Sequence, residues 1–139
     1  MAESQFFKTE IDATLSAVGE LLDSMAPRLS ELSLGQSTAH AVMLCVEEIA
    51  ANSVNYGGIH GQHRALAVTL ARVPEAVIAR VSYPGPRFDP IAEAPAGQPG
   101  FDQVGGRGLY LVQQLASAVA YTHQAGHNTV TIRIAHRPL

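Results

Sequence analysis

Five short stretches of the chain predict β-strands: the first alternates between apolar and polar residues, and the others are runs rich in apolar and β-branched residues. The stretches are 4–11, 65–73, 76–83, 119–124 and 129–135. Only Pro74 and Glu75 separate the second stretch from the third, so these two predict a β-hairpin. The last two stretches predict a closing hairpin whose turn comprises residues 125–128.

Apolar residues spaced by three and four predict a helix after the first strand. They are Leu15, Val18, Leu22, Met25 and Leu29. Asp12 is the expected N-cap, because its carboxylate can accept hydrogen bonds from the first backbone N–H groups of a helix. Pro27 has no backbone N–H, so we expect this helix to end or kink near Met25.

Two more helices are predicted further along the chain. Ser33 and Gln36 form a capping-box pattern, so a second helix is expected to start there and to end at Gly57 and Gly58. The stretch 109–119 predicts a third helix. Earlier in the chain, residues 84–104 are rich in Pro, Gly and Ala, and a loop of this length in a small domain is usually functional. Because helices and hairpins come in separate groups, the predicted fold class is α+β with a largely antiparallel sheet, in one domain over residues 1–139.

Composition narrows the class of protein. The formal net charge is -3, and binding to a nucleic acid backbone needs clustered Lys and Arg, so we expect no direct nucleic acid partner. The single cysteine, Cys45, lies in an apolar run and is expected to be a buried thiol. The chain starts without an apolar targeting segment, and no apolar stretch has membrane-spanning length. We therefore expect a cytoplasmic protein without membrane contacts.

Polar residues share one face of the second predicted helix. Glu48, Asn52 and Asn55 are spaced by four and three residues, while their neighbours are mostly apolar. An amide carbonyl such as that of Asn52 suits a magnesium ion, and a carboxylate such as Glu48, one turn away, suits a general base. The alternative interpretation is a polar seam packed against a loop or against another subunit.

Two glycine-containing segments are candidates for ligand contacts. Residues Gly105, Gly106, Arg107 and Gly108 directly precede the third predicted helix, where unpaired N–H groups and a guanidinium favour a phosphate. The alternative is a flexible loop before an ordinary helix start. The second segment, VSYPGPRFDP over residues 81–90, follows a strand, and by itself it needs no role beyond that of a stiff turn.

In this order along the chain, the three segments resemble a known superfamily. EEIAANSVNYG (47–57), YPGPRFDP (83–90) and GGRGLYLVQQLASAVAY (105–121) are similar to the N, G1 and G2 boxes of the GHKL ATPases, which include gyrase and the histidine kinases. More closely, the chain resembles the anti-sigma factor serine kinases of bacterial partner-switching systems. The resemblance implies the Bergerat fold, a two-layer α/β sandwich with helices on one face of a mixed, mostly antiparallel sheet.

The resemblance also implies ATP and Mg²⁺ as cofactors and gives individual residues a role. Asn52 would hold the magnesium ion, Glu48 would be the catalytic base, and Gly85 would approach the adenine. The other implied contacts to ATP come from Tyr83, Gly105, Gly106, Arg107, Gly108 and Leu109. In this family the phosphoryl group passes to a serine or threonine of a STAS-type antagonist protein. The kinase can alternatively hold a sigma factor inactive, and its members are commonly homodimers.

Tyr83 departs from the family pattern. The G1 box of the family reads Asp-x-Gly, and its aspartate accepts a hydrogen bond from the adenine amino group, whereas this chain has Tyr83-Pro84-Gly85. The tyrosine ring is bulkier and could fill the adenine pocket itself. Two functions follow: an ATP-dependent serine/threonine kinase with anti-sigma activity, or a degenerate relative that binds partners with weak or no nucleotide binding. A detached histidine-kinase domain is a third, and no phosphoacceptor helix supports it.

Overall fold

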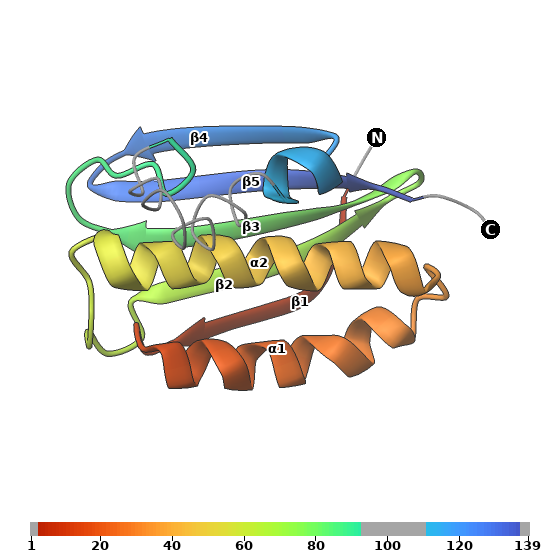
Figure 1. Ribbon diagram of the computed structural model, residues 1–139, viewed down its shortest axis with the longest axis horizontal. Coiled ribbons are helices and arrows are strands. Elements are labelled where there is room, and N and C mark those ends of the chain that lie inside the picture. The colour runs from red at the N-terminus through yellow and green to blue at the C-terminus, as the bar shows by residue number, and fades with distance from the viewer. Residues whose placement is uncertain (1–2, 93–110, 137–139) are drawn as a thin grey trace, which may run out of the picture.

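The computed structural model describes residues 3–92 and 111–136, whose arrangement is shown in Figure 1. The elements are β1 (Ser4–Ile11), α1 (Leu15–Ser30), α2 (Gln36–Tyr56), β2 (Leu66–Val73), β3 (Ala76–Pro84), β4 (Ala118–Gln124) and β5 (His127–Ala135). The five strands form one sheet in the order β1-β2-β3-β5-β4, and each neighbouring pair is antiparallel. β3 and β4 run in the same direction, but β5 lies between them, so the described sheet has no parallel pair. The α+β fold class and both hairpins are confirmed.

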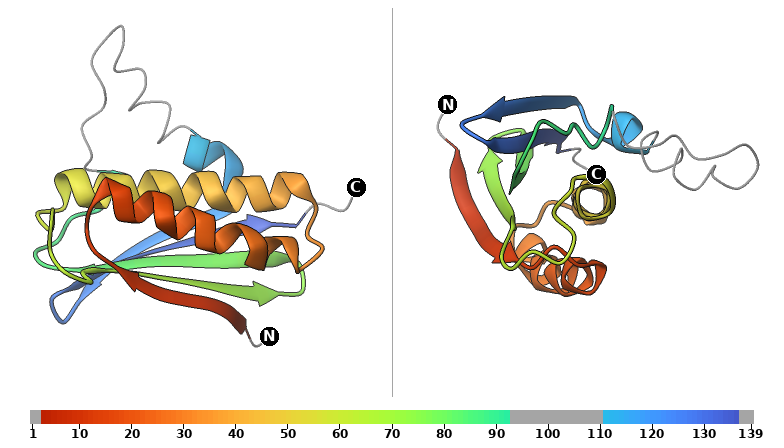
Figure 2. Two further views of the ribbon diagram at one scale, coloured as in Figure 1. Left: turned by 90° about the horizontal axis from the view of Figure 1, so that it is seen from below. Right: turned by 90° about the vertical axis from the view of Figure 1, so that its left-hand side faces the viewer.

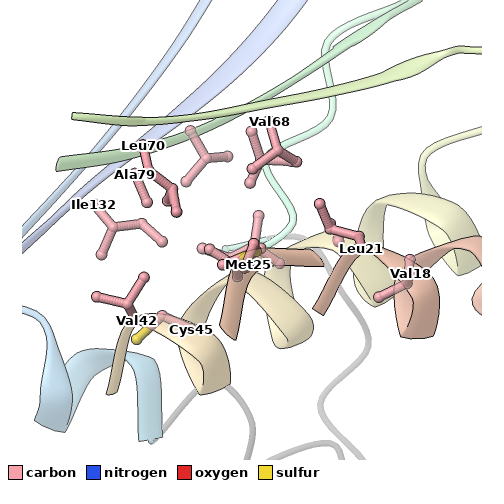
Figure 3. Packing of buried hydrophobic residues seen from close by; sticks show 14 of the residues in the cluster. Val18, Leu21, Met25, Val42, Cys45, Val68, Leu70, Ala79 and Ile132 are labelled. Atoms are coloured by element: carbon pink, nitrogen blue, oxygen red, sulfur yellow. The ribbon is translucent and has the colours of Figure 1, made fainter. Parts of the chain in front are cut away.

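The two long helices lie side by side on one face of the sheet (Figures 1 and 2). α1 contacts β1, while α2 contacts β3 and β5. Figure 3 shows how the buried sides of the helices meet the sheet in a hydrophobic core; the side chains labelled there are Val18, Leu21, Met25, Val42, Cys45, Val68, Leu70, Ala79 and Ile132. Cys45 is 1% exposed, and this burial raises the pKa of its thiol to about 11, so the expected buried thiol is confirmed.

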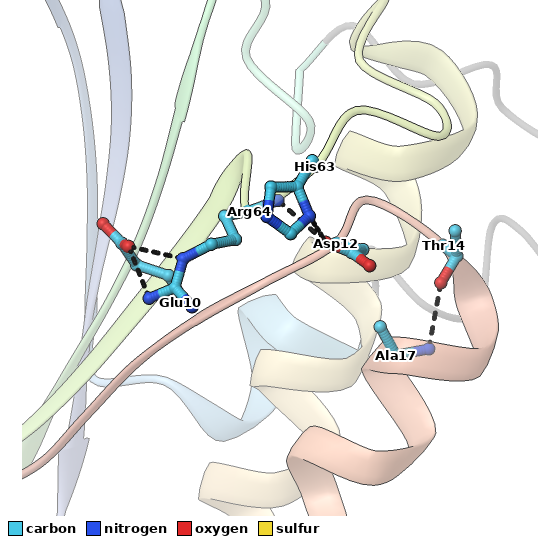
Figure 4. Close-up of polar contacts among 6 residues, drawn as sticks. All are labelled: Glu10, Asp12, Thr14, Ala17, His63 and Arg64. Atoms are coloured by element: carbon cyan, nitrogen blue, oxygen red, sulfur yellow. Dashed lines mark hydrogen bonds and ion pairs between the residues drawn. The ribbon is translucent and has the colours of Figure 1, made fainter.

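The start of α1 differs from the prediction. Its N-cap is Thr14, whose side chain accepts a hydrogen bond from the backbone N–H of Ala17 (3.1 Å). Asp12 instead accepts hydrogen bonds from the backbone N–H of Arg64 (2.9 Å) and from His63 Nδ1 (2.9 Å), as Figure 4 shows. The Arg64 N–H is the main cause that lowers the pKa of the Asp12 carboxyl. Asp12 therefore fastens the loop before β2 to the end of β1 and does not cap the helix.

Two other helix boundaries also differ from the prediction. α1 does not end near Met25 but continues through Pro27 to Ser30; Pro27 and Asp23 are both exposed, so water can hydrate the Asp23 carbonyl that has lost its helical partner. The capping box at the start of α2 does not form. Ser33 has a φ of +53° in the preceding turn, and Gly35 is the N-cap without a side-chain hydrogen bond. The predicted end of α2 is confirmed at Gly57.

The third predicted helix is shorter than expected at its C-terminal end. The described part of this helix covers residues 111–115, and β4 already begins at Ala118. The backbone N–H of Ser117 donates to the carbonyl of Arg133 (2.8 Å), which draws the chain into the sheet. None of the helices in the described parts of the chain is long and apolar enough to span a membrane.

Candidate functional site

The polar stripe of α2 meets the segment that follows β3. Glu48 and Asn52 are both half-buried, and the Asn52 side-chain nitrogen donates a hydrogen bond to the backbone carbonyl of Pro90 (3.3 Å). Asn55, the third residue of the stripe, is exposed. The stripe therefore packs against a loop at Asn52, as its simpler interpretation predicts. The bond uses the nitrogen of the amide and not its oxygen, the atom that suits a hard cation.

The carboxyl of Glu48 has a raised pKa. The main cause is burial, which disfavours the charged form, and the negative charge of the neighbouring Glu47 adds to it. A carboxylate whose pKa is raised is a better proton acceptor near neutral pH than an exposed one. Glu47, the preceding residue of the helix, is exposed. The two adjacent carboxylates thus differ in environment: Glu48 is half-buried and has a raised pKa, whereas Glu47 is exposed.

Tyr83 lies inside the fold at the end of β3. Its side chain is 0% exposed, and it alternates along the strand with Ala79 and Val81, which are buried toward the helix layer as well. The hydroxyl of Tyr83 donates a hydrogen bond to the backbone carbonyl of Phe88. The ring is therefore part of the packed interior, with its polar atom bonded to the turn that follows the strand.

Gly85 allows the chain to turn sharply after Tyr83. Its φ of +118° lies in the region that favours glycine, and a Cβ built there would meet no atom within 4 Å. Glycine is thus required by the backbone conformation and not by lack of space. The backbone N–H of Gly85 donates to the carbonyl of Gly126 (2.9 Å), so the turn is anchored to the β4–β5 hairpin.

Asn128 holds the same turn from β5. Its side chain is 0% exposed. The Oδ1 atom accepts hydrogen bonds from the backbone N–H of Phe88 (2.8 Å) and from the Tyr121 hydroxyl. The Nδ2 atom donates to the backbone carbonyls of Pro86 (3.1 Å) and Tyr83 (3.4 Å). The hydrogen-bonding capacity of this amide is therefore used to fix the backbone between Tyr83 and Phe88.

β4 contributes a second set of contacts to the turn. The His123 side chain hydrogen-bonds through Nε2 to the carbonyl of Gly85 (2.9 Å). The Tyr121 hydroxyl also accepts a hydrogen bond from the Phe88 N–H (3.0 Å). The Arg87 guanidinium lies over the Tyr121 ring, 4.8 Å from its centroid, within the range of a cation–π contact. Both strands of the closing hairpin therefore position the turn.

The turn leads directly to Asn52. The Asp89 carboxylate accepts hydrogen bonds from the backbone N–H groups of Ile91 (2.9 Å) and Ala92 (3.3 Å). Between Phe88 and Ile91, the buried Pro90 places its carbonyl against the Asn52 amide. The segment 88–90 thus connects the wall around Tyr83 with the polar stripe of α2.

The structure therefore brings together part of the predicted site. Asn52 and Tyr83 both hydrogen-bond to the segment 85–90, which begins at Gly85. Glu48 lies one turn before Asn52 on the same helix. The predicted phosphate-contacting residues lie outside the described residues; they are Gly105, Gly106, Arg107, Gly108 and Leu109. Within residues 3–92 and 111–136, no group of His, Cys, Asp or Glu side chains is arranged as a multidentate metal site.

Asn128 is the residue that the sequence interpretation missed. Glycine and asparagine are typical of turns, so the pattern predicts that Asn128 belongs to a hairpin turn over residues 125–128. The observed turn comprises only Ala125 and Gly126, both with positive φ, and β5 starts at His127. Asn128 then alternates with Val130 and Ile132 on the buried face. A polar residue in phase with buried apolar ones was the available signal.

The family of the chain follows from its sequence. The sequence model of one protein family, the histidine kinase-like ATPase domain, matches residues 11–134 of the chain. The chain therefore belongs to this family. The resemblance to the GHKL superfamily is thereby confirmed. No curated protein matches the chain.

Solved structures support the same fold. The chain resembles the structure of the RsbU and RsbW domains of Rv1364c from Mycobacterium tuberculosis, with a TM-score of 0.69 and 22% identity over 95% of this chain and 33% of that one. It also resembles a chain of the SiaB–SiaC complex from Pseudomonas aeruginosa, with a TM-score of 0.64 and 18% identity over 94% of this chain and 90% of that one. The present chain thus spans about a third of the Mycobacterium chain. At these levels of sequence identity, the structural similarity shows a shared fold and nothing further.

Proposed function

We propose that the protein is a partner-switching regulator that binds Mg-ATP weakly and transfers the γ-phosphoryl group to a serine or threonine of a STAS-type antagonist. By holding a sigma factor instead, it acts as an anti-sigma factor. The observation that carries this proposal is the pair Glu48 and Asn52, half-buried one turn apart on α2 and joined through Asn52 to the turn after β3. The family match over residues 11–134 supports a nucleotide site.

The residues of α2 fit the metal and phosphate end of such a ligand. A magnesium ion bound to ATP takes only one or two protein ligands together with phosphate oxygens and water, and the Asn52 oxygen can supply one. Glu48 would accept the proton of the attacking hydroxyl while the γ-phosphoryl group passes to its oxygen and ADP leaves. Its burial and raised pKa support that role. The glycine segment 105–108 would provide backbone N–H groups for the phosphates.

The wall around Tyr83 fits an adenine base less well. The acidic acceptor of the family is absent, and the Tyr83 ring is buried where it packs against the core. Its hydroxyl donates to the Phe88 carbonyl, and position 83 offers no carboxylate to an adenine amino group. A site that lacks the group which recognises a base loses discrimination between bases. We therefore expect weak ATP binding with little preference for adenine over guanine.

Two of the structural neighbours have names that point to protein partners. One is a chain of a complex between SiaB and SiaC, and the other carries RsbU and RsbW domains. These names support a protein partner for the present chain, which we propose to be an antagonist of the STAS type. The homodimer is a proposal that rests on the family resemblance alone. The formal charge of -3 supports protein partners over nucleic acid.

The roles of Glu48 and Asn52 can be separated by experiment. Glu48→Ala should lower phosphoryl transfer to the antagonist by about 10²- to 10⁴-fold with little change in nucleotide affinity, because a base acts in the transition state. Asn52→Ala should weaken the magnesium-dependent part of ATP binding. Glu20→Ala, at an exposed carboxylate of α1, is the matched control and should change neither. Equal effects of the first two substitutions on ATP affinity would contradict the assigned roles.

A second candidate function is favoured by the burial of Tyr83. In this case the protein is a binding switch that holds its partner without nucleotide, and the Tyr83 ring permanently fills the place of the base. The partner would then be retained equally well with and without Mg-ATP. Pull-down from the host cytoplasm in both conditions distinguishes the two candidates, because the first one predicts a nucleotide-dependent exchange of partners. Recovery of only nucleic acid or membrane would count against both.

A further inference from the structure

A cavity of about 170 Å³ lies at the N-terminal end of α2, between this helix, the short helix 111–115 and the end of β5. Figure 1 shows the short helix beside the first half of α2. The apolar part of the cavity wall comes from Ala41, Leu115 and Ile134, and the polar side chains are those of Ser37, Thr38 and Gln114. Among the described residues, no Lys, Arg, Asp or Glu lines this cavity. A ligand bound there would therefore be held by neutral polar groups.

The backbone at the start of α2 supplies hydrogen-bond donors. Gly35 is its N-cap and has no side chain to bond the N–H groups that follow, whereas Thr14 caps α1. The N–H of Ala39 donates to the carbonyl of Gly35 (3.2 Å). Within residues 3–92 and 111–136, the N–H groups of Ser37 and Thr38 have no acceptor. Because α2 has 21 residues, its aligned peptide dipoles also place a partial positive charge at this end, which favours an anion.

Thr38 gives an independent indication of a ligand. It is only 3% exposed, yet its hydroxyl makes no hydrogen bond to any of the described residues. Ser53, further along the same helix, is buried as well, and its hydroxyl donates to the carbonyl of Ile49 (2.8 Å). A buried hydroxyl without a partner destabilises a fold, whereas a valine of similar shape does not. Since Thr38 lines the cavity, a polar group bound there would complete its hydrogen bonding.

From these observations we propose that the cavity is a binding site for a small tetrahedral oxyanion of the phosphate class. The anion accepts hydrogen bonds from the backbone N–H groups of Ser37 and Thr38 and from the Thr38 hydroxyl. Backbone N–H groups at a helix N-terminus are a known means of binding such anions. Because no Lys or Arg of the described chain lines the cavity, the dissociation constant should be on the order of millimolar.

This site is separate from the proposed Mg-ATP site. Thr38 precedes Glu48 by ten residues on α2, which corresponds to about 15 Å along the helix. Neither Glu48 nor Asn52 lines the cavity. The proposal therefore does not depend on nucleotide binding, and its failure would leave the proposed function unaffected.

A phosphate titration in magnesium-free buffer, followed by NMR of the backbone amides and by thermal unfolding, tests the site. Sodium chloride at equal ionic strength is the reference. Phosphate should shift the amide signals of Ser37 and Thr38 in a saturable manner. Thr38→Val keeps the shape of the side chain, so its Tm without phosphate should be no lower than that of the wild type, while its phosphate affinity should fall at least about tenfold. Thr122→Val, at an exposed threonine of β4, is the matched control and should bind phosphate like the wild type.

A charge at position 37 tests the same site without changing Thr38. Ser37→Asp places a carboxylate at the cavity, where it repels an anion, although a carboxylate in the first turn of a helix stabilises the fold. This variant should be folded and should lose the saturable response to phosphate, whereas Ser37→Asn should keep it. The proposal is overturned if phosphate and chloride act alike on the wild type. It is also overturned if folded Thr38→Val binds phosphate as tightly as the wild type, or if Ser37→Asp binds it as tightly as Ser37→Asn.

Discussion

Replacing Asn128 by Ala should loosen the turn after β3 and destabilise the whole domain. The substitution removes one acceptor and one donor group, which together serve Phe88, Tyr121, Pro86 and Tyr83. A net hydrogen bond contributes about 1 kcal/mol, and a buried group left without a partner costs about 1–3 kcal/mol. The Phe88 N–H retains the Tyr121 hydroxyl as a partner, and Pro86 is exposed to water, so part of the loss is compensated. The expected cost is about 2–4 kcal/mol.

Thermal unfolding measures this cost. For a domain of this size, about 2–4 kcal/mol corresponds to a fall in Tm of roughly 6–12 °C. Asn55→Ala, at an exposed asparagine of α2, is the matched control and should change the stability by less than about 0.5 kcal/mol. Hydrogen exchange at the Phe88 amide should also become faster in Asn128→Ala. A variant with the stability and the Phe88 protection of the wild type would refute the clamping role of Asn128.

Two further predictions concern ionisation and the closing turn. Burial raises the pKa of Glu48, so folding favours its protonated form. The stability that depends on this carboxyl is therefore full at low pH, and it falls as the pH rises from the usual pKa of about 4.5 through the raised pKa. Glu48→Gln should therefore have a higher Tm than the wild type at about pH 7 and lose this advantage at about pH 4, and an equal difference at both values would argue against the raised pKa. Ala125 adopts a φ of +53° at the first position of the β4–β5 turn, where asparagine is preferred. Ala125→Asn should raise the stability by about 1 kcal/mol and Ala125→Val should lower it, as denaturant titration can show.

The sequence pattern predicts the strands because each one is a run of apolar and β-branched residues bounded by turn residues. The helix ends were less predictable, since they depend on contacts with distant residues. Asp12 has the chemistry of an N-cap, but Arg64 and His63, more than fifty residues away, take its carboxylate. The predicted turn of the closing hairpin is two residues too long, because glycine and asparagine are both typical of turns. Only the register of β5 shows that Asn128 is buried.

The candidate site was predictable in part, because local spacing along a helix fixes some of its residues while contacts between distant residues fix the others. Glu48 and Asn52 were found because four residues make one helical turn and so fix their common face. The departure at Tyr83 was visible in the sequence, whereas the direction of its side chain was not. That direction depends on the burial of alternate residues of β3 and on the carbonyl of Phe88. The contact of Asn52 with Pro90 joins residues 38 positions apart, which no local pattern indicates.

The central claim is that the chain keeps a Mg-ATP site whose base wall is altered at Tyr83, and paired titrations with ATP and GTP test it most directly. Tyr83→Asp restores an acidic acceptor, although it removes a fully buried ring, so its fold must be verified first. Tyr83→Phe removes only the hydroxyl and is the control. We predict weak binding of both nucleotides by the wild type and by Tyr83→Phe, and a selective gain for ATP in folded Tyr83→Asp. Tight, adenine-selective binding by the wild type, or no gain in folded Tyr83→Asp, would contradict the account.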